Sequence, residues 1–166
     1  MYRIIKYILI FIKINCSAMD NAELFRFADS MAFYESSNNP DTLIIDNKGR
    51  VFIGLFQFSK PALQDIGYDH VFGRFLCEKQ TIFPDWCQYI CFAKLCVKNE
   101  KKLKKQDICY GKTIHDVFLT KSGALAACHL AGYNGFMEWV RNGSNKCDFK
   151  GTSIVDYIKR FEKFDL

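Results

Sequence analysis

One carboxylate in the N-terminal part of the chain stands where a buried side chain is expected. Four apolar residues recur at the spacing of a single helix face: Leu24, Phe27, Ala28 and Met31. The next step of four residues along that face is Glu35. A carboxylate in the last turn of a helix faces the negative end of the helix dipole, and Phe33, Tyr34 and Phe56 would exclude water from it. Both effects favour the protonated acid, which can act as a general acid. The alternative is a glutamate that turns outward at a fraying helix end.

The elements that would position this glutamate are mostly helices. Helical patterns are expected over residues 20–36, 59–68, 84–106, 120–131, 134–141 and 151–163, the third as one long helix or a broken pair. The first opens with Asp20 and Glu23 at the spacing of a capping box, Gly132 separates the fourth from the fifth, and Thr152 or Ser153 opens the last. "DNKGR" indicates a turn, and "VFIGLFQF" a short strand or extended loop. The sequence therefore predicts an α+β fold that is predominantly α-helical.

Three short segments carry a resemblance to a known family. "ESSNNP", "GLFQF" and "AACHLAGYNG" follow one another as the three signature segments of the lytic transglycosylases do, a family of the lysozyme superfamily with a pattern like E-S-x-x-N-P, G-L-M-Q and A-Y-N-A-G. The matching residues of the first two segments are Glu35, Ser36, Asn39, Pro40, Gly54, Leu55 and Gln57, with Phe56 in place of the usual methionine. The similarity covers roughly residues 24–141. It implies a lysozyme-like fold with a small β element after the catalytic helix.

The third segment departs from the family pattern. An alignment on Ala126, Ala127 and Gly132 needs no gap and puts His129 where the family has a tyrosine close to the catalytic acid. The other register uses the pair Tyr133 and Asn134 in "GYNG". We prefer His129 for this place. The alternative for His129 is a core histidine that bonds a backbone carbonyl.

The resemblance implies cleavage of the β-1,4 bond between N-acetylmuramic acid and N-acetylglucosamine in peptidoglycan. Glu35 would protonate the leaving oxygen, the substrate's acetamido group would stabilise the positive centre, and Glu35 would then take a proton from the muramyl 6-hydroxyl. Gln57 and the backbone around Gly54 would hold the acetamido group, and Ser36 would orient Glu35. Faces for sugar rings are expected from Phe56, Phe58 and Tyr133. No metal and no cofactor is expected.

Two other functions compete with this one. A lysozyme-type hydrolase needs a second acid to position water, and Asp41 or Asp46 follows Glu35 in the chain, although both residues suit turns. A non-catalytic glycan-binding or structural module would keep the cleft without the chemistry, and the altered third segment favours it. The products formed from peptidoglycan would separate the three functions.

The first eighteen residues differ in composition from the rest. "MYRIIKYILIFIKINCSA" holds three basic residues and no acidic one, and it ends in small residues as a secretory signal does. Lys6 and Lys13 shorten its uncharged run, so a start at Met19 and a surface anchor are the alternatives. The prefix is too short and too charged to span a bilayer. We expect residues 19–166 to form a single, monomeric domain that is periplasmic or secreted, or delivered from the cytoplasm by another route if residues 1–18 are no signal.

Charge gives little support to nucleic-acid binding. The chain has a net charge of +5, and loss of the three basic residues of the prefix lowers it to +2. The remaining excess lies in the lysine run "KNEKKLKKQ", residues 98–106. Such a run is typical of a solvated helix face, and the alternative is attraction to an anionic polymer such as a wall glycan or teichoic acid. The expected partners are peptidoglycan glycan strands.

The cysteines leave the redox state open. They are Cys16, Cys77, Cys87, Cys91, Cys96, Cys109, Cys128 and Cys147. Seven remain after a cut at Ala18, an odd number, so an exported form would keep a free thiol or pair one with another chain. Buried thiols are the commonest interpretation, with one or two disulfides next. A zinc site is least favoured because C-x-x-C spacing is missing.

Overall fold

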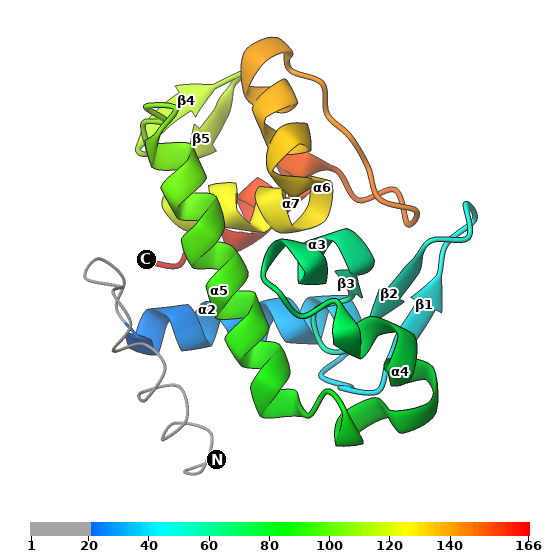
Figure 1. Cartoon of the computed structure of the whole chain (residues 1–166). Helices are drawn as coiled ribbons and strands as arrows, with labels where there is room; N and C mark the ends of the chain where they lie inside the picture. The colour runs from blue at the N-terminus through cyan, green and yellow to red at the C-terminus, as the bar shows by residue number, and fades with distance from the viewer. Residues whose placement is uncertain (1–20) are drawn as a thin grey trace. The chain divides into compact units, whose positions relative to one another are not determined.

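The computed structural model describes residues 21–166 (Figure 1). Helix accounts for 57% of these residues and the strands form small antiparallel pairs, which confirms the prediction of a mostly helical α+β fold. The chain divides into two compact units, Met1–Leu95 and Cys96–Leu166, and each is described by itself. The expected signal over residues 1–18, Cys16 and the Asp20 end of the capping box lie outside the described residues. A single domain over residues 19–166 stays a prediction.

The described part of the first unit combines helices with a small sheet. Its elements are α2 (Asn21–Ser36), β1 (Leu43–Ile45), β2 (Val51–Ile53), β3 (Phe58–Ser59), α3 (Lys60–Asp65), α4 (His70–Glu78), the 3-10 helix η1 (Lys79–Thr81) and the first part of α5 (Asp85–Lys104). The second unit begins within α5, which is one unbroken helix. The sequence patterns do not predict β1, α4 and η1 as separate elements.

Helix α2 has the predicted apolar face. Leu24, Phe27, Ala28 and Met31 are all buried. The helix ends at Ser36, as "SSNNPD" predicts, because the next two residues adopt left-handed backbone angles, with φ of 55° at Ser37 and 61° at Asn38. Their amides donate to the carbonyls of Phe33 and Ala32, at 2.9 and 3.3 Å, and so close the last turn.

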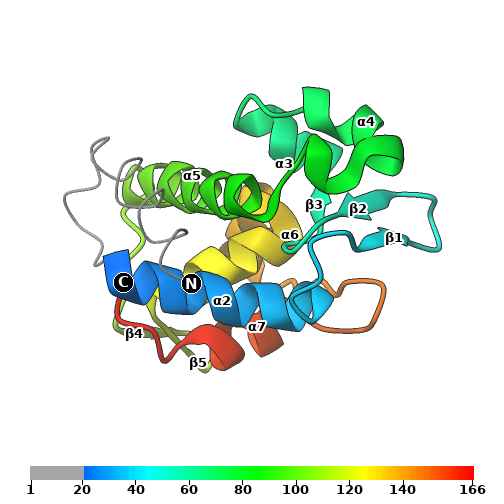
Figure 2. The same cartoon turned by 90° about the horizontal axis from the view of Figure 1, so that it is seen from below.

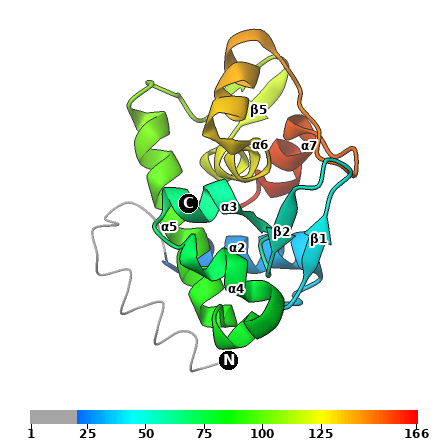
Figure 3. The same cartoon turned by 45° about the vertical axis from the view of Figure 1, so that its right-hand side comes forward.

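The sheet follows α2 directly and has the strand order β1-β2-β3, all antiparallel (Figure 3). Leu43 pairs with Ile53 and Ile45 with Val51 across the first two strands, which the predicted turn at residues 46–50 connects. Helix α3 begins directly after β3. Ser59 caps it by accepting from the Ala62 amide, and Pro61 lies in its first turn, as expected.

Aromatic rings dominate the core of the first unit. Phe56 stacks on Phe92 of α5 with ring centroids 4.4 Å apart, and Phe27 of α2 contacts the same ring at 5.5 Å. Phe58 packs against Phe83, and all five rings are buried. Helices α2 and α5 therefore share one core with the turn that follows β2.

The second unit holds a hairpin and two further helices. Its elements after α5 are β4 (Lys112–Ile114), β5 (Val117–Leu119), α6 (Lys121–Asn142) and α7 (Ile154–Phe161). The β4–β5 hairpin is not predicted from the sequence. Its two-residue turn places His115 and Asp116 at φ of 48° and 62°, where Asn-Gly is the usual signal.

Helices α6 and α7 pack against each other (Figure 2). Helix α6 is interrupted at Gly132, where φ is 70° and ψ is 162°, so the predicted break between two helical segments is confirmed. Ser153 opens α7 with a capping box completed by Asp156, which confirms one of the two expected caps. Trp139 of α6 and Tyr157 of α7 are the largest fully buried side chains of the unit.

Candidate active site

Glu35 lies half-buried in the last turn of α2. Met31, one turn earlier on the same face, is fully buried, so the glutamate continues the apolar face to the edge of the core. Phe33 does not shield it as expected, because this side chain is 65% exposed. Two residues correspond to about 200° around a helix, so Phe33 lies opposite the buried face.

The loop after Glu35 is held by hydrogen bonds of its own. Asn39 accepts an amide hydrogen bond from Asp41 at 3.0 Å through its side chain, and its carbonyl accepts from the Thr42 amide at 3.2 Å. The Ser36 hydroxyl donates to the Ala32 carbonyl at 3.0 Å and so stabilises the helix end. The motif residues Ser36 and Asn39 thus shape the backbone around Glu35. A direct role of Ser36 in orienting Glu35 stays a prediction.

The second motif forms a tight turn between β2 and β3. Gly54 and Gln57 have φ of 76° and 47°, and the Gln57 amide donates to the Gly54 carbonyl at 3.2 Å. The Gly54 amide donates to the Thr42 carbonyl at 2.8 Å, which joins this turn to the loop after Glu35. Glu35, Ser36, Gly54 and Gln57 therefore belong to connected segments of one unit, and Figure 1 shows the end of α2 beside the sheet.

The side chain of Gln57 is bonded at one end only. Its Nε2 donates to the Gly54 carbonyl at 2.7 Å, whereas its Oε1 is buried and has no hydrogen-bond partner within residues 21–166. A buried amide oxygen without a donor is rare in folded proteins and calls for a water or a ligand. Gln57 therefore has an acceptor that no group of the described chain uses, and its expected role toward an acetamido N–H stays a prediction.

Phe56 and Phe58 do not offer faces to sugar rings, contrary to the expectation for both. Phe56 is 0% exposed and Phe58 1%, and their rings are 5.6 Å apart within the core. Phe56 occupies the methionine position of the family pattern, and the structure gives it a packing role. Phe56 points inward from the turn and Phe58 from the first position of β3, while Gln57 between them is only half-buried.

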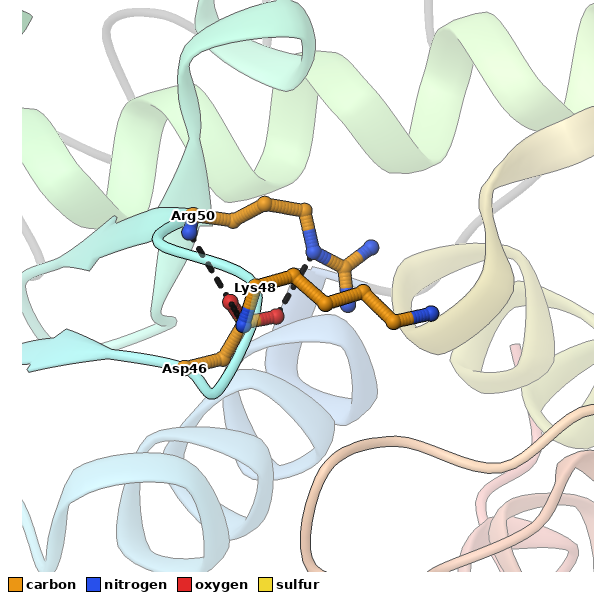
Figure 4. Close-up of polar contacts among 3 residues, drawn as sticks. All are labelled: Asp46, Lys48 and Arg50. Atoms are coloured by element: carbon orange, nitrogen blue, oxygen red, sulfur yellow. Dashed lines mark hydrogen bonds and ion pairs between the residues drawn. The ribbon is translucent and has the colours of Figure 1, made fainter.

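Asp46 is a turn residue. Its carboxylate accepts from the amides of Lys48 and Arg50 at 2.9 and 2.8 Å and from Arg50 Nε at 2.6 Å (Figure 4). Burial raises the pKa of this carboxyl, but the hydrogen bonds from Arg50 and Lys48 outweigh it, and the pKa lies below its ordinary value. All of these bonds shape the hairpin. Asp46 is therefore a poor second acid.

Asp41 has a different environment. One carboxylate oxygen accepts from Gln80 Nε2 at 3.3 Å, and the other, Oδ1, is buried without a hydrogen-bond partner in the described part of the chain. Of the two carboxylates named for a hydrolase, Asp41 alone has an oxygen left to bond water or substrate.

Gln88 belongs to this region and is not predicted from the sequence as a site residue. It lies on α5, is 0% exposed, and bonds the backbone at Pro40, Leu55 and Phe83. A signal was present in the sequence. Cys91, Phe92 and Leu95 follow Gln88 at helical spacing and are buried, so Gln88 is a polar residue on an apolar face, as Glu35 is.

The residues named from the third motif lie in the second unit. His129 is half-buried in α6 before the break at Gly132, and Tyr133 is half-buried after it. The ammonium group of Lys102, from the lysine run, lies 5.4 Å from the Tyr133 ring centroid, and Asn134 is exposed. The break therefore separates the two candidate registers into different helical segments.

The second unit buries one carboxylate, that of Glu100. Its Oε1 lies 2.9 Å from Lys104 Nζ and 3.0 Å from Lys121 Nζ, and the side chain is 5% exposed. Burial raises the pKa of Glu100, the two lysines lower it more, and the pKa lies below its ordinary value. Burial of the Tyr110 hydroxyl, with the Glu100 charge nearby, raises the pKa of Tyr110 to about 12. Part of the lysine run is therefore neutralised within the chain.

All seven described cysteines are free thiols, of which Cys87, Cys91, Cys96 and Cys128 are buried. A hydrogen bond between the thiols of Cys87 and Cys91 lowers the pKa of Cys87 and raises that of Cys91. Within residues 21–166, no group of three or more His, Cys, Asp or Glu side chains is arranged to hold a metal ion.

None of the helices described combines the length and the apolar character that a membrane crossing requires. Comparison of the chain with protein-family models, with curated proteins and with solved structures gives no match.

Proposed function

We propose that this protein is a peptidoglycan lytic transglycosylase of the cell envelope that uses Glu35 as its single acid and base. One observation carries the proposal: the loop after Glu35 is bonded to the turn that presents Gln57, whose buried Oε1 has no partner within the described chain. An acid and a fixed amide acceptor on joined segments suit a substrate with a glycosidic oxygen next to an acetamido group.

The reaction needs no second carboxylate. Glu35 donates its proton to the leaving glycosidic oxygen as the bond to the muramyl anomeric carbon breaks, while the substrate's own acetamido oxygen stabilises that carbon. The Glu35 carboxylate then takes the proton of the muramyl 6-hydroxyl, whose oxygen closes the 1,6-anhydro ring. The Asp46 carboxylate is bonded to Lys48 and Arg50 of the hairpin turn, and this supports a route that does not use Asp46 as a second acid.

A lysozyme-type hydrolase is the second candidate, because Asp41 has a buried oxygen without a partner in the described chain. In that mechanism Asp41 would hold the attacking water, and the product would be a reducing sugar end. Asp41 lies in the loop directly after Glu35, so its position in the chain suits either role.

Mass spectrometry of purified sacculi after digestion separates the candidates. Anhydromuramyl ends identify a transglycosylase and reducing ends a hydrolase, and an intact glycan identifies a non-catalytic module. Glu35→Gln removes the proton and keeps the side-chain volume, so we expect cleavage to fall to a few per cent or less with an unchanged unfolding midpoint.

The matched control is Glu23→Gln on the same helix, where the glutamate pairs with the exposed Arg26. It should cleave at the parent rate. Substantial activity of Glu35→Gln would contradict the assignment of Glu35.

The register of the third motif has its own test. If His129 takes the place of the family's tyrosine, His129→Ala should lower the cleavage rate by about 10²-fold, and His129→Tyr should retain activity. Tyr133→Phe keeps the ring that Lys102 covers and should be mild. A severe Tyr133→Phe with a silent His129→Ala would assign the role to Tyr133.

A further inference from the structure

The amide of Gln88 bonds three separate stretches of irregular backbone. Its Oε1 accepts from the Leu55 amide at 2.5 Å, and its Nε2 donates to the carbonyls of Phe83 at 2.8 Å and Pro40 at 3.1 Å. Leu55 belongs to the turn of Gln57, and Pro40 to the loop after Glu35. One buried side chain therefore connects both motif segments of the proposed site to α5.

The turn of Gln57 needs such an anchor. Gln57, which is not a glycine, has a φ of 47°, a strained conformation that persists where the surrounding structure holds the backbone in place. The backbone at Gly54 also lies so close to α5 that an ideal Cβ there would lie 2.3 Å from Gln88 Oε1. The backbone of the turn is thus in close contact with the side-chain amide of Gln88 and hydrogen-bonded to it.

We propose that Gln88 is the positioning residue of the site, setting the Gln57 turn relative to the Glu35 loop. This inference rests on the proposed function. The chemistry requires an amide, because the site needs one acceptor and two donors on a single planar group. A carboxylate could accept from Leu55 but would face the carbonyls of Phe83 and Pro40 without a proton to donate, and an apolar side chain would leave all three backbone groups buried and unpaired.

Hydrogen exchange of the full-length protein tests the positioning directly. In Gln88→Leu we expect exchange to rise about tenfold or more in peptides covering residues 38–42 and 54–58, while peptides from α2 and α7 keep the parent rate. Gln88→Glu, close in shape, should show the same pattern and serves if Gln88→Leu does not fold. A uniform rise over all peptides, or no rise in these two segments, would overturn the proposal.

Tyr89→Phe is the matched control on the next residue of α5. It removes the hydrogen bond from Tyr89 to Asp29 of α2 but keeps the ring against Phe25 and Phe56. Because this bond joins two helices and reaches neither motif segment, exchange at residues 38–42 and 54–58 should stay at the parent rate. A rise equal to that of the Gln88 variants would show that any loosening of α5 disturbs the turn, which contradicts a specific role for Gln88.

Kinetics on peptidoglycan separate this proposal from the proposed function. If the parent cleaves glycan, folded Gln88→Glu should lose about tenfold or more in kcat with a smaller change in KM, since Glu35 and Gln57 are then misplaced but present. Tyr89→Phe should keep the parent kcat. An unchanged kcat in Gln88→Glu would overturn the role. If the parent does not cleave glycan, the proposed function fails, and the exchange pattern alone decides whether Gln88 positions the two segments.

Discussion

The buried Gln88 and Asp46 of the first unit and the buried Glu100 of the second unit have different kinds of hydrogen-bond partner. In the first unit the buried Gln88 and Asp46 bond mainly to backbone groups of loops and turns. In the second unit the buried Glu100 bonds to the side chains of Lys104 and Lys121. The first arrangement holds irregular backbone in one shape, and the second ties α5 to the first residue of α6.

The difference follows from what each unit contains. Helical backbone satisfies its own donors and acceptors, so a buried charge next to it needs only an opposite charge. Loops and tight turns leave amides and carbonyls that need partners from elsewhere, and an amide side chain supplies both kinds. Buried side-chain bonds to loop backbone thus mark the part of the molecule whose irregular shape matters, which is where the proposed chemistry lies.

Glu100→Gln should give the largest loss of stability. It removes the buried anion that the Lys121 ammonium, on a side chain only 13% exposed, pairs with. We expect a loss of about 3 kcal/mol in the free energy of unfolding, measured by urea denaturation. Glu138→Gln is the control, because its pair with Lys146 is exposed on both sides and should change stability little. An equal loss of unfolding free energy in Glu100→Gln and Glu138→Gln would show that the buried ion pair of the second unit contributes no more than an exposed one.

Gly54→Ala should come next and tests the first unit. A Cβ at Gly54 must displace the Gln88 amide, and alanine at a φ of 76° is strained, so we expect a loss of about 2–3 kcal/mol. Gly49→Ala has nearly the same φ, 74°, with no atom within 4 Å, and should lose only about 1 kcal/mol. Thermal unfolding of both variants isolates the contact with Gln88. If the two losses agree, Gln88 does not constrain the turn.

The smallest expected effect concerns the acid stability of Asp46. Its pKa is lowered in the folded state from an ordinary value of 3.8, so its contribution is present above that value and is lost as the pH falls through the folded pKa. Asp46→Asn keeps an acceptor for the turn amides and loses the charge toward Arg50. Its melting temperature should be slightly lower than the parent's at neutral pH and should fall less below about pH 4. Parallel curves for parent and variant would show that the Asp46 charge does not stabilise the hairpin.

Features that depend on neighbouring residues were predictable from the sequence. The apolar face of α2 and its end after Ser36, the break at Gly132 and the cap at Ser153 all follow from side chains within a few positions of one another. The turn at residues 46–50 belongs to the same class, because Asp46 bonds amides two and four residues later. Glu35 stood out for the same local reason, as a carboxylate on an apolar helix face.

Contacts between residues far apart in the sequence, and the burial that results from them, were decided by the tertiary structure alone. Gln88 bonds residues 33 and 48 positions away, Phe56 turns into the core instead of toward a ligand, and Phe33 lies in solvent. The β4–β5 hairpin forms with His115 and Asp116 at positive φ, which no turn signal in the sequence indicates. Local sequence patterns predict helix faces and caps. The partner of a buried polar group is determined by packing between segments that are far apart in the sequence. The sequence therefore determined that Glu35 is unusual, and the packing of α5 against two loops decided which side chain holds its surroundings in place.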